Sequence, residues 1–317
     1  MTVVTRFAPS PTGGLHLGHA MSAVAAHDFA RARGGTFLVR IEDIDGTRSR
    51  SEHVAGILED LEWLGLAWDG EVMFQSRRLA SYEVALDRLR AMNLLYACFC
   101  TRADIAASAS APHGRAGAVY PGTCRGVDNR QRMHEPHCWR IDIAKALSVL
   151  PGTGRWRAQR DGGGGRRADR AWPPPSTSFA GPPPRPGEDL WWHDEAEGWQ
   201  LADPLAAGDV VLARKDAPAS YHLAVTVDDA AQGITDIVRG VDLFAATHVH
   251  RLLQALLGLP TPRYHHHPLL VGPDGQRLAK RNGARALAEL REDGAGGRGL
   301  ATDIRSGAIG FLSRIPK

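Results

Sequence analysis

The chain has 317 residues, 43% of them hydrophobic and 23% charged, with four cysteines and a formal net charge of +3 at pH 7. This length leaves room for one large domain or two with an ample core, the composition is ordinary for a soluble globular protein, and the small charge does not by itself indicate nucleic acid binding. Because no apolar run approaches the roughly 18 residues of a membrane span and no basic stretch precedes an apolar core at the N-terminus, we expect a cytoplasmic protein without a membrane segment or signal peptide.

The first predicted elements are a short buried strand, an irregular turn and a helix. Residues 2–7 have the composition of a strand, and the run Ala20–Ala32, which lacks glycine and proline, predicts a helix. Between them, Arg6–His19 contains two prolines, a glycine pair, His16 and His19. This order places free backbone N–H groups and the positive end of a helix dipole at one point, where phosphate can bind. The two histidines either face one ligand or merely cap and pack an ordinary turn.

A second buried strand, Thr36–Ile41, follows the helix. Together with the first strand it forms a βαβ unit, which predicts a parallel pair. The strand leads directly into the acidic stretch Glu42–Asp45. Two segments with helical spacing of apolar residues come next, Ser51–Leu64 and Leu79–Leu94. The first part of the chain is therefore predicted to be an α/β fold.

The cysteines lie in the middle of the chain and begin within the short apolar segment Leu95–Cys100. Cys98 and Cys100 are separated by one residue, which suggests metal or thiol chemistry in a reducing compartment rather than a disulfide framework. Zinc takes about four soft or borderline ligands in a tetrahedron, and Cys124 is a plausible third. The local competitors for the fourth position are His113, His137 and Cys138. The alternative is a group of buried free thiols.

The composition changes over residues 151–192, where glycine, proline and arginine dominate. The runs Gly162–Gly165, Pro173–Pro175 and Pro182–Pro184 leave little apolar periodicity. We interpret this segment as a long loop or a disordered insertion. It also carries the basic excess of the chain, so it either contacts RNA or is a solvated arginine-rich loop.

Regular patterns return after the insertion. The apolar residues predict three strands and then a helix, at Asp209–Arg214, Tyr221–Asp229, Ile234–Gly240 and Leu243–Leu257. Gly258 is a plausible cap at the end of this helix. The triple histidine His265–His267 has no partner spacing that would make it a metal site. A Gly-Pro-Asp-Gly turn then leads to the basic segment Arg277–Arg281.

Four separated stretches resemble the signatures of class I aminoacyl-tRNA synthetases in their glutamyl form, in matching order and spacing. They are similar to the HIGH signature, the block after it, the substrate-pocket block and a degenerate KMSKS loop, and they lie at 6–19, 41–48, 237–243 and 277–281. Ala279 stands where the last signature usually has serine. The resemblance extends over roughly residues 2–290. It implies an α/β fold: a Rossmann-type catalytic domain with an inserted acceptor-type α/β subdomain that carries a zinc site.

The same resemblance implies a division of the chain into four parts. They are the first half of the catalytic domain, the zinc-bearing insertion with its Gly/Pro/Arg-rich loop, the second half and a short tail, at 1–95, 96–208, 209–290 and 291–317. Full glutamyl-tRNA synthetases continue into helical anticodon-binding domains, for which this tail leaves no room. The chain therefore resembles the short glutamyl-queuosine tRNA(Asp) synthetase family. That family activates glutamate without tRNA and places it on the queuosine base in the anticodon of tRNA(Asp).

This resemblance implies an ATP-dependent ligase that acts on L-glutamate, ATP and queuosine-containing tRNA(Asp). We expect a monomer with one structural Zn²⁺ and with Mg²⁺ accompanying ATP. Two alternatives remain: a truncated glutamyl-tRNA synthetase that charges a tRNA 3′ end, and a non-catalytic tRNA-binding paralogue. Ala279 and the short C-terminus favour the second alternative.

The family motifs also imply site residues at matching positions. Activation requires the enzyme to position two anions, glutamate and ATP, and to stabilise the charge that develops in the transition state. The match therefore implies catalytic roles for His16, His19 and Lys280. The implied ATP-binding residues are His16, Gly18, His19 and Lys280. The implied zinc ligands are Cys98, Cys100, Tyr120 and Cys124, although tyrosine is an unusual ligand.

The implied glutamate pocket follows from the two carboxylates and the ammonium of the substrate. A guanidinium group binds a carboxylate through two bonds, and an acidic side chain binds an ammonium. The matching residues are Arg6, Phe7, Ala8, Pro9, Ser10, Glu42, Tyr221 and Arg239. Without the resemblance, surface ion pairs and a packed tyrosine would be the simpler interpretation of these side chains.

Overall fold

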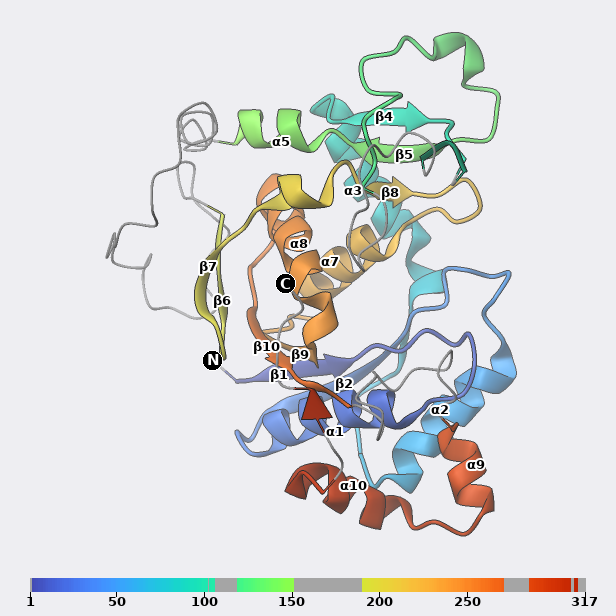
Figure 1. Cartoon of the computed structure of the whole chain (residues 1–317), viewed down its shortest axis with the longest axis vertical. Helices are drawn as coiled ribbons and strands as arrows, with labels where there is room; N and C mark the ends of the chain where they lie inside the picture. The colour runs from blue at the N-terminus through green and yellow to red at the C-terminus, as the bar shows by residue number, and fades with distance from the viewer. Residues whose placement is uncertain are drawn as a thin grey trace.

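Parallel strands from both halves of the chain form the centre of the fold (Figure 1). The computed structural model describes residues 2–101, 103–105, 119–150, 190–270, 285–308 and 311–312. Strands β1 (Val4–Phe7), β2 (Thr36–Ile41) and β3 (Met73–Phe74) form one parallel sheet in the order β1-β2-β3. The predicted βαβ unit is therefore confirmed, and β2 has the predicted bounds.

A second sheet continues the first. Its order is β7-β6-β10-β9, with β7 (Gly198–Leu201), β6 (Trp191–Asp194), β10 (Arg263–His267) and β9 (Asp236–Gly240). Strands β6, β10 and β9 are parallel, whereas β7 is antiparallel to β6. The backbone N–H of Thr235 donates to the carbonyl of Val4 at 3.0 Å, which fixes β9 beside β1. The result is a Rossmann-like α/β arrangement.

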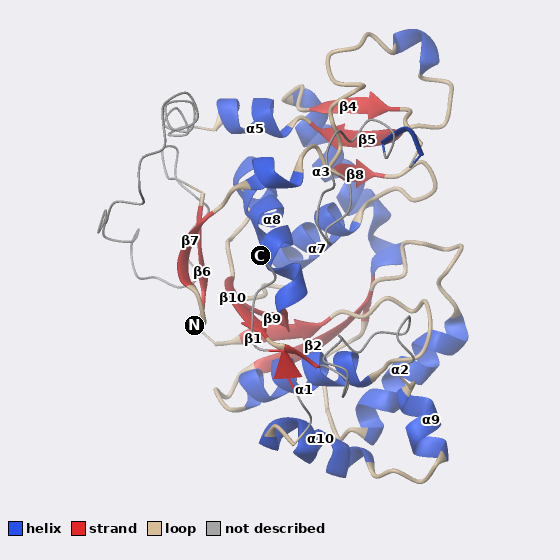
Figure 2. Cartoon of the chain, viewed as in Figure 1, coloured by secondary structure: helices blue, strands red, loops and turns tan. Residues whose placement is uncertain are grey.

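Helices cover both faces of these sheets (Figure 2). One core joins β1 and β2 to α1 (Leu17–Arg31), α2 (Ser51–Trp63), α9 (Leu287–Glu292) and α10 (Gly297–Ser306). The other core joins α3 (Leu79–Ala91), α7 (Tyr221–Ala231) and α8 (Phe244–Leu257) to β9 and β10. Because side chains of a strand alternate, Ile237 enters one core and Val238 the other. Gly258 ends α8 in the left-handed conformation, as predicted.

The predicted strand at Tyr221–Asp229 is wrong, because these residues form helix α7. The β-branched residues Val225, Thr226 and Val227 favoured a strand. In the fold, however, Leu223 and Ala224 are buried against α3 and α8, and helical spacing also places Asp228 and Asp229 inside. Tertiary packing therefore overrides the local preference.

A separate antiparallel sheet carries the cysteines. It has the order β4-β5-β8, with β4 (Leu95–Cys98), β5 (Cys138–Ile141) and β8 (Val211–Ala213), and helix α5 (Ile143–Val149) follows β5. Strand β8 pairs with β5 in this sheet, whereas β6 and β7 belong to the sheet that contains β9 and β10. The predicted division of the chain into four parts stays a prediction. The predicted 151–192 insertion ends earlier, since Trp191 begins β6, and residues 151–189 lie outside the described residues.

The tail after residue 290 packs on the first half of the chain. Ala301 and Ile304 are buried with α1 and α2, as is Leu287 just before this tail, and Arg305 pairs with Asp28 at 2.7 Å. Strand β11 (Leu269–Leu270) forms a short antiparallel pair with β12 (Phe311–Leu312), which follows these helices in the chain. No helix in the described ranges is long and apolar enough to cross a membrane.

Candidate functional site

A cavity of about 490 Å³ opens at the carboxyl ends of β1, β2, β9 and β10. This edge, where the strand order reverses, is where open α/β sheets bind ligands. The structure brings the predicted glutamate and ATP residues of the described chain together along its walls: Arg6, Phe7, Ala8, Pro9, Ser10, His16, Gly18, His19, Glu42, Tyr221 and Arg239. Lys280 lies outside the described residues. The described segments before and after it both reach this region, because Leu270 lines the cavity and Ala286 pairs with His16.

His16 and His19 cap helix α1 and line the cavity at the same time. The Nδ1 atom of His16 accepts from the N–H of Gly18 at 3.1 Å, and Nδ1 of His19 accepts from the N–H of His16 at 3.2 Å. The two rings stack with their centroids 3.8 Å apart. A neutral imidazole that accepts at Nδ1 carries its hydrogen on Nε2. Each ring therefore has a donor of the kind that binds a phosphate oxygen, and capping and ligand binding are compatible.

Arg6 reaches the cavity from β1, and its guanidinium group forms an ion pair within the protein. Its Nε donates to the buried carboxylate of Asp229 at 2.9 Å, and Arg40 donates to the same oxygen at 2.6 Å. Burial is the largest single effect and would lower the pKa of Arg6, but the charge of Asp229, its hydrogen bond to Arg6 and the smaller effects of Tyr221 and Glu42 together raise that pKa. The chain spacing did not reveal Asp229, because it lies on α7, far along the chain from β1.

Arg239, at the carboxyl end of β9, is held differently. Its hydrogen-bond partners in the described chain are neutral: His266, Tyr221, His250, the carbonyl of Leu243 and the hydroxyl of Thr247. Burial, and then the charge of Arg239, holds the pKa of His250 well below its usual range. The guanidinium charge therefore faces the cavity without a carboxylate in contact among the described residues.

Glu42 follows β2 and supplies an acidic group to the same cavity. Burial raises its pKa to about 7, although Arg40 and Arg6 pull the pKa down. Tyr221 is 37% exposed, and its hydroxyl accepts from Arg239 at 3.4 Å. Two guanidinium groups, the carboxyl groups of Glu42 and Asp242 and one phenol thus line the same cavity.

Several cavity residues were not predicted from the sequence. His267 lines the cavity and its Nε2 lies 3.0 Å from the hydroxyl of Ser22. Gly240 ends β9 where a Cβ would come within 2.5 Å of the Asp242 carboxylate and 2.9 Å of a Leu269 methyl group, so a larger residue would require both side chains to move. The sequence signal that could have revealed His267 is the triple histidine immediately before Pro268. Side chains alternate between the two faces of a strand, so a row of histidines at the end of a strand places some of them on each face.

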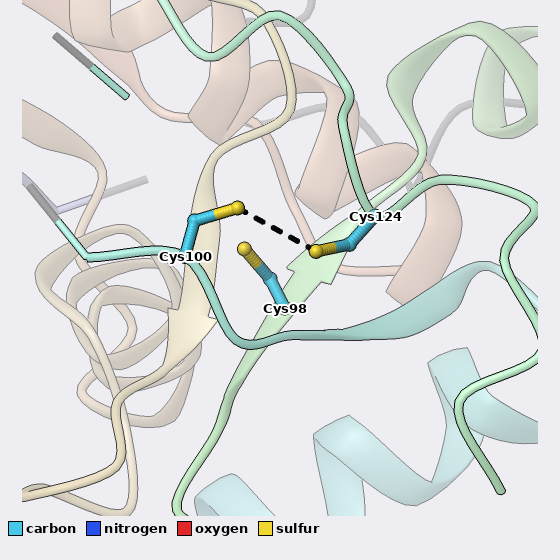
Figure 3. Close-up of side chains that lie close together, drawn as sticks. All are labelled: Cys98, Cys100 and Cys124. Carbon is cyan, nitrogen blue, oxygen red and sulfur yellow. Dashed lines mark hydrogen bonds between the residues drawn. The ribbon is translucent and has the colours of Figure 1, made fainter. Parts of the chain in front are cut away.

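Three of the four predicted zinc ligands are thiols that point toward one another (Figure 3). The sulfur atoms of Cys98, Cys100 and Cys124 all lie within 4.8 Å of one another, and Cys100 and Cys124 are 3.6 Å apart. The Tyr120 hydroxyl lies 3.4 Å from the Cys98 sulfur and 3.7 Å from the Cys100 sulfur. Ligands around tetrahedral zinc are separated by about 3.5–3.8 Å, given Zn–S near 2.3 Å and Zn–O near 2.0 Å. The donor set therefore fits one zinc ion.

Of the competing ligands, neither Cys138 nor His137 belongs to the three-sulfur group. The Cys138 thiol donates to the carbonyl of Cys98 at 3.4 Å and is not part of the three-sulfur group. Its proximity is the largest factor that lowers the pKa of the Cys98 thiol, and the Tyr120 hydroxyl adds to this. His113 lies outside the described residues, and His137 contacts Phe99 and Trp139.

His137 belongs to an aromatic–basic row, defined as Arg132, Phe99, His137, Trp139 and Arg90. Neighbouring members are 4.3 to 5.3 Å apart, measured from guanidinium carbon to ring centroid or between centroids. Because side chains alternate along β5, Trp139 points to the face opposite Cys138. The row borders a second, wide cavity of about 450 Å³ that Lys215 also lines.

Comparisons with known proteins agree with this geometry. The family model "tRNA synthetases class I (E and Q), catalytic domain" matches residues 2–148 and 186–302. The Glutamyl-Q tRNA(Asp) synthetase of Rhodobacter capsulatus is 47% identical over 92% of this chain and 96% of its own length. The protein of the same name from Symbiobacterium thermophilum is 42% identical over 98% of this chain and 86% of its own length.

Among solved structures, the glutamate-tRNA synthetase from Elizabethkingia anophelis matches 89% of this chain with a TM-score of 0.64 and 25% identity. This chain spans 53% of that longer protein. On these findings, the chain belongs to the class I tRNA synthetases (E and Q), in the group whose curated members are named Glutamyl-Q tRNA(Asp) synthetase.

Proposed function

We propose that this protein activates L-glutamate with ATP to glutamyl-adenylate without tRNA, and transfers the glutamate to the queuosine base in the anticodon of tRNA(Asp). The observation that carries the proposal is the convergence of Arg6, Glu42 and Arg239 with His16 and His19 on one cavity. The two cations suit an anionic amino acid, and the start of α1 suits the phosphates of ATP. The names of the relatives support the acceptor.

In the activation step, the α-carboxylate of glutamate attacks the α-phosphorus of ATP, a new O–P bond forms, and pyrophosphate leaves. No side chain becomes covalent, so the protein acts by positioning and by stabilising charge. We assign the substrate carboxylates to Arg6 and Arg239 and the ammonium to Glu42. His16 and His19 would donate to phosphate oxygens of ATP bound with Mg²⁺. Lys280 would neutralise the charge that develops on pyrophosphate.

The inserted sheet would hold one structural zinc ion through Cys98, Cys100, Tyr120 and Cys124. Three of their separations, Cys98–Tyr120, Cys100–Tyr120 and Cys100–Cys124, support this assignment, because they lie near the edge length of a zinc tetrahedron. Four protein ligands leave no open position, so the ion would fix the loops of the β4-β5-β8 sheet rather than take part in the reaction. The thiols are free, which suits a reducing cytoplasm.

The aromatic–basic row supports an RNA partner for the inserted sheet. Aromatic rings and guanidinium planes stack on unpaired bases, and the bases of an anticodon loop are unpaired. Arg132 and Arg90 are already paired with acidic side chains, so stacking would contribute more than charge. The segment from Lys215 to Tyr221 runs from the second cavity to the glutamate cavity. An RNA strand on the row would therefore lead toward the site of transfer.

The test separates activation from transfer. Pyrophosphate exchange should depend on glutamate in preference to glutamine and aspartate, without any tRNA, and transfer should require queuosine in tRNA(Asp). The Trp139→Ala variant should keep the exchange activity and lose transfer. Transfer to tRNA that lacks queuosine would favour charging of a 3′ end. Absence of adenylate formation by zinc-loaded protein would indicate a non-catalytic tRNA-binding role and contradict the proposal.

A further inference from the structure

Three side chains on neighbouring strands form a row that ends at Arg239. Asp194 lies on β6, His266 on β10 and Arg239 on β9, and these strands are adjacent in the sheet. The register places His266 directly opposite Arg239. The Nδ1 atom of His266 is 2.6 Å from a carboxylate oxygen of Asp194, and its Nε2 is 3.1 Å from Nε of Arg239. All three are buried, with at most 8% exposure.

The hydrogen-bond directions in this row are determined by its two ends. Asp194 accepts at Oδ1 from the N–H groups of Ala196 and Glu197, both at 3.0 Å, and at Oδ2 from the ring. A carboxylate only accepts and a guanidinium only donates. His266 must therefore carry its hydrogen on Nδ1 and present the lone pair of Nε2 to Arg239. Burial lowers the pKa of His266 to about 4, which keeps the ring neutral.

The charge state of this row matters for substrate choice. Arg6 shares its charge with Asp229 in direct contact, whereas Arg239 is separated from Asp194 by a neutral ring. Arg239 is thus held in place without being neutralised. A ligand carboxylate would supply the missing negative charge, but the amide of glutamine would not.

We infer that Asp194 and His266 are positioning residues that hold Arg239 toward the cavity with its charge uncompensated, and that they set the preference for glutamate over glutamine. This inference rests on the proposed function, because it deepens the role of the same cavity. Neither residue lines the cavity, so each acts through Arg239.

Paired substitutions test the inference by glutamate-dependent pyrophosphate exchange without tRNA. In the His266→Gln variant, the side-chain amide oxygen can take the place of the acceptor Nε2 of the histidine. In the His266→Asn variant, the shorter side chain reaches only the place of Nδ1. The His266→Asn variant should raise KM for glutamate about 10- to 100-fold, the scale of a lost hydrogen bond to a charged group, with kcat little changed. The His266→Gln variant should stay within about 3-fold of wild type, because this bond is kept.

A second route changes Asp194. In Asp194→Asn, Oδ1 would keep its backbone donors and the new N–H₂ would face the ring, so Nε2 would carry hydrogen toward Arg239. This reversal should also raise KM for glutamate and reduce the ratio of kcat/KM for glutamate over glutamine. The upward shift in thermal midpoint on adding glutamate should shrink in parallel, which gives a readout besides activity.

The matched control is His265→Asn, on the same strand. His265 is also bonded to a buried carboxylate, that of Asp236 at 2.9 Å, but it lies on the opposite face of the strand. Its KM for glutamate should equal that of wild type. Unchanged KM in His266→Asn and Asp194→Asn, or equal losses in His266→Gln and His266→Asn, would overturn the inference. Wild-type protein without glutamate-dependent exchange would instead refute the proposed function.

Discussion

Glu42 is the acidic side chain of the cavity whose ionisation should govern the pH response of activation. Burial raises its pKa to about 7, so the carboxyl group is largely neutral at pH 6 and ionised at pH 8. Only the ionised form pairs with the ammonium of glutamate. We expect kcat/KM for glutamate in pyrophosphate exchange to rise about tenfold from pH 6 to pH 8, because this ratio reports the pKa of the free enzyme.

The Glu42→Gln variant provides the control for this profile. Its kcat/KM at pH 8 should fall by about 10- to 100-fold through loss of the bond to a charged group. The rise between pH 6 and pH 8 should disappear in the variant. If the rise persists unchanged, another group of the cavity titrates, and the role given to Glu42 is wrong.

Single residues of the cavity were predictable where a motif has fixed spacing. His16 and His19 are three residues apart at a helix start, and that spacing alone brings both rings to one cavity. The residues that orient the cationic groups were not predictable. Asp229, His266 and Asp194 reach Arg6 and Arg239 through strand order and register, which local sequence does not encode.

At the scale of elements, the β4-β5-β8 sheet should depend on zinc. We expect purified protein to contain about one zinc ion per chain, and removal of zinc by a chelator to lower the thermal midpoint, because binding to a site formed on folding stabilises the fold. Exchange activity of the surviving folded protein should change less than transfer to tRNA. The reason is that the glutamate cavity is built on other sheets.

Two thiol variants identify the ligands. The Cys124→Ser variant should lose zinc as measured by metal analysis, since its sulfur belongs to the three-sulfur group. The Cys138→Ser variant should retain zinc, because that thiol bonds to a backbone carbonyl instead. Equal zinc loss in both variants would assign the fourth ligand to Cys138 and remove Tyr120 from the site.

Elements were predictable where one periodicity dominated. The strand Thr36–Ile41 and the helix that begins at Ser51 have the predicted positions. Helix α7 was mistaken for a strand because β-branched residues obscured its helical face. Helix α1 begins at Leu17, before the predicted start, because His16 caps it through its own side chain.

At the scale of the whole molecule, the halves of the chain meet through contacts that have no local signal. Thr235 pairs with Val4 to join the two parallel sheets, and the tail helices cover α1 and α2. The sequence around Gly294–Gly299 offers small residues without apolar periodicity, so no helix was predicted there. Helix α10 nevertheless begins at Gly297, because its first residue packs directly on the backbone of Trp63.

The docking of α10 predicts opposite effects for two glycines of one helix. A Cβ on Gly297 would lie 2.2 Å from the carbonyl oxygen of Trp63, whereas a Cβ on Gly299 would meet nothing within 4 Å. Gly297→Ala should lower the free energy of unfolding by about 1–3 kcal/mol, as overpacking does. Gly299→Ala should leave it unchanged or raise it by up to about 1 kcal/mol through helix propensity. Urea denaturation at matched protein concentration distinguishes them, and equal midpoints for the two variants would show that α10 does not depend on this close contact.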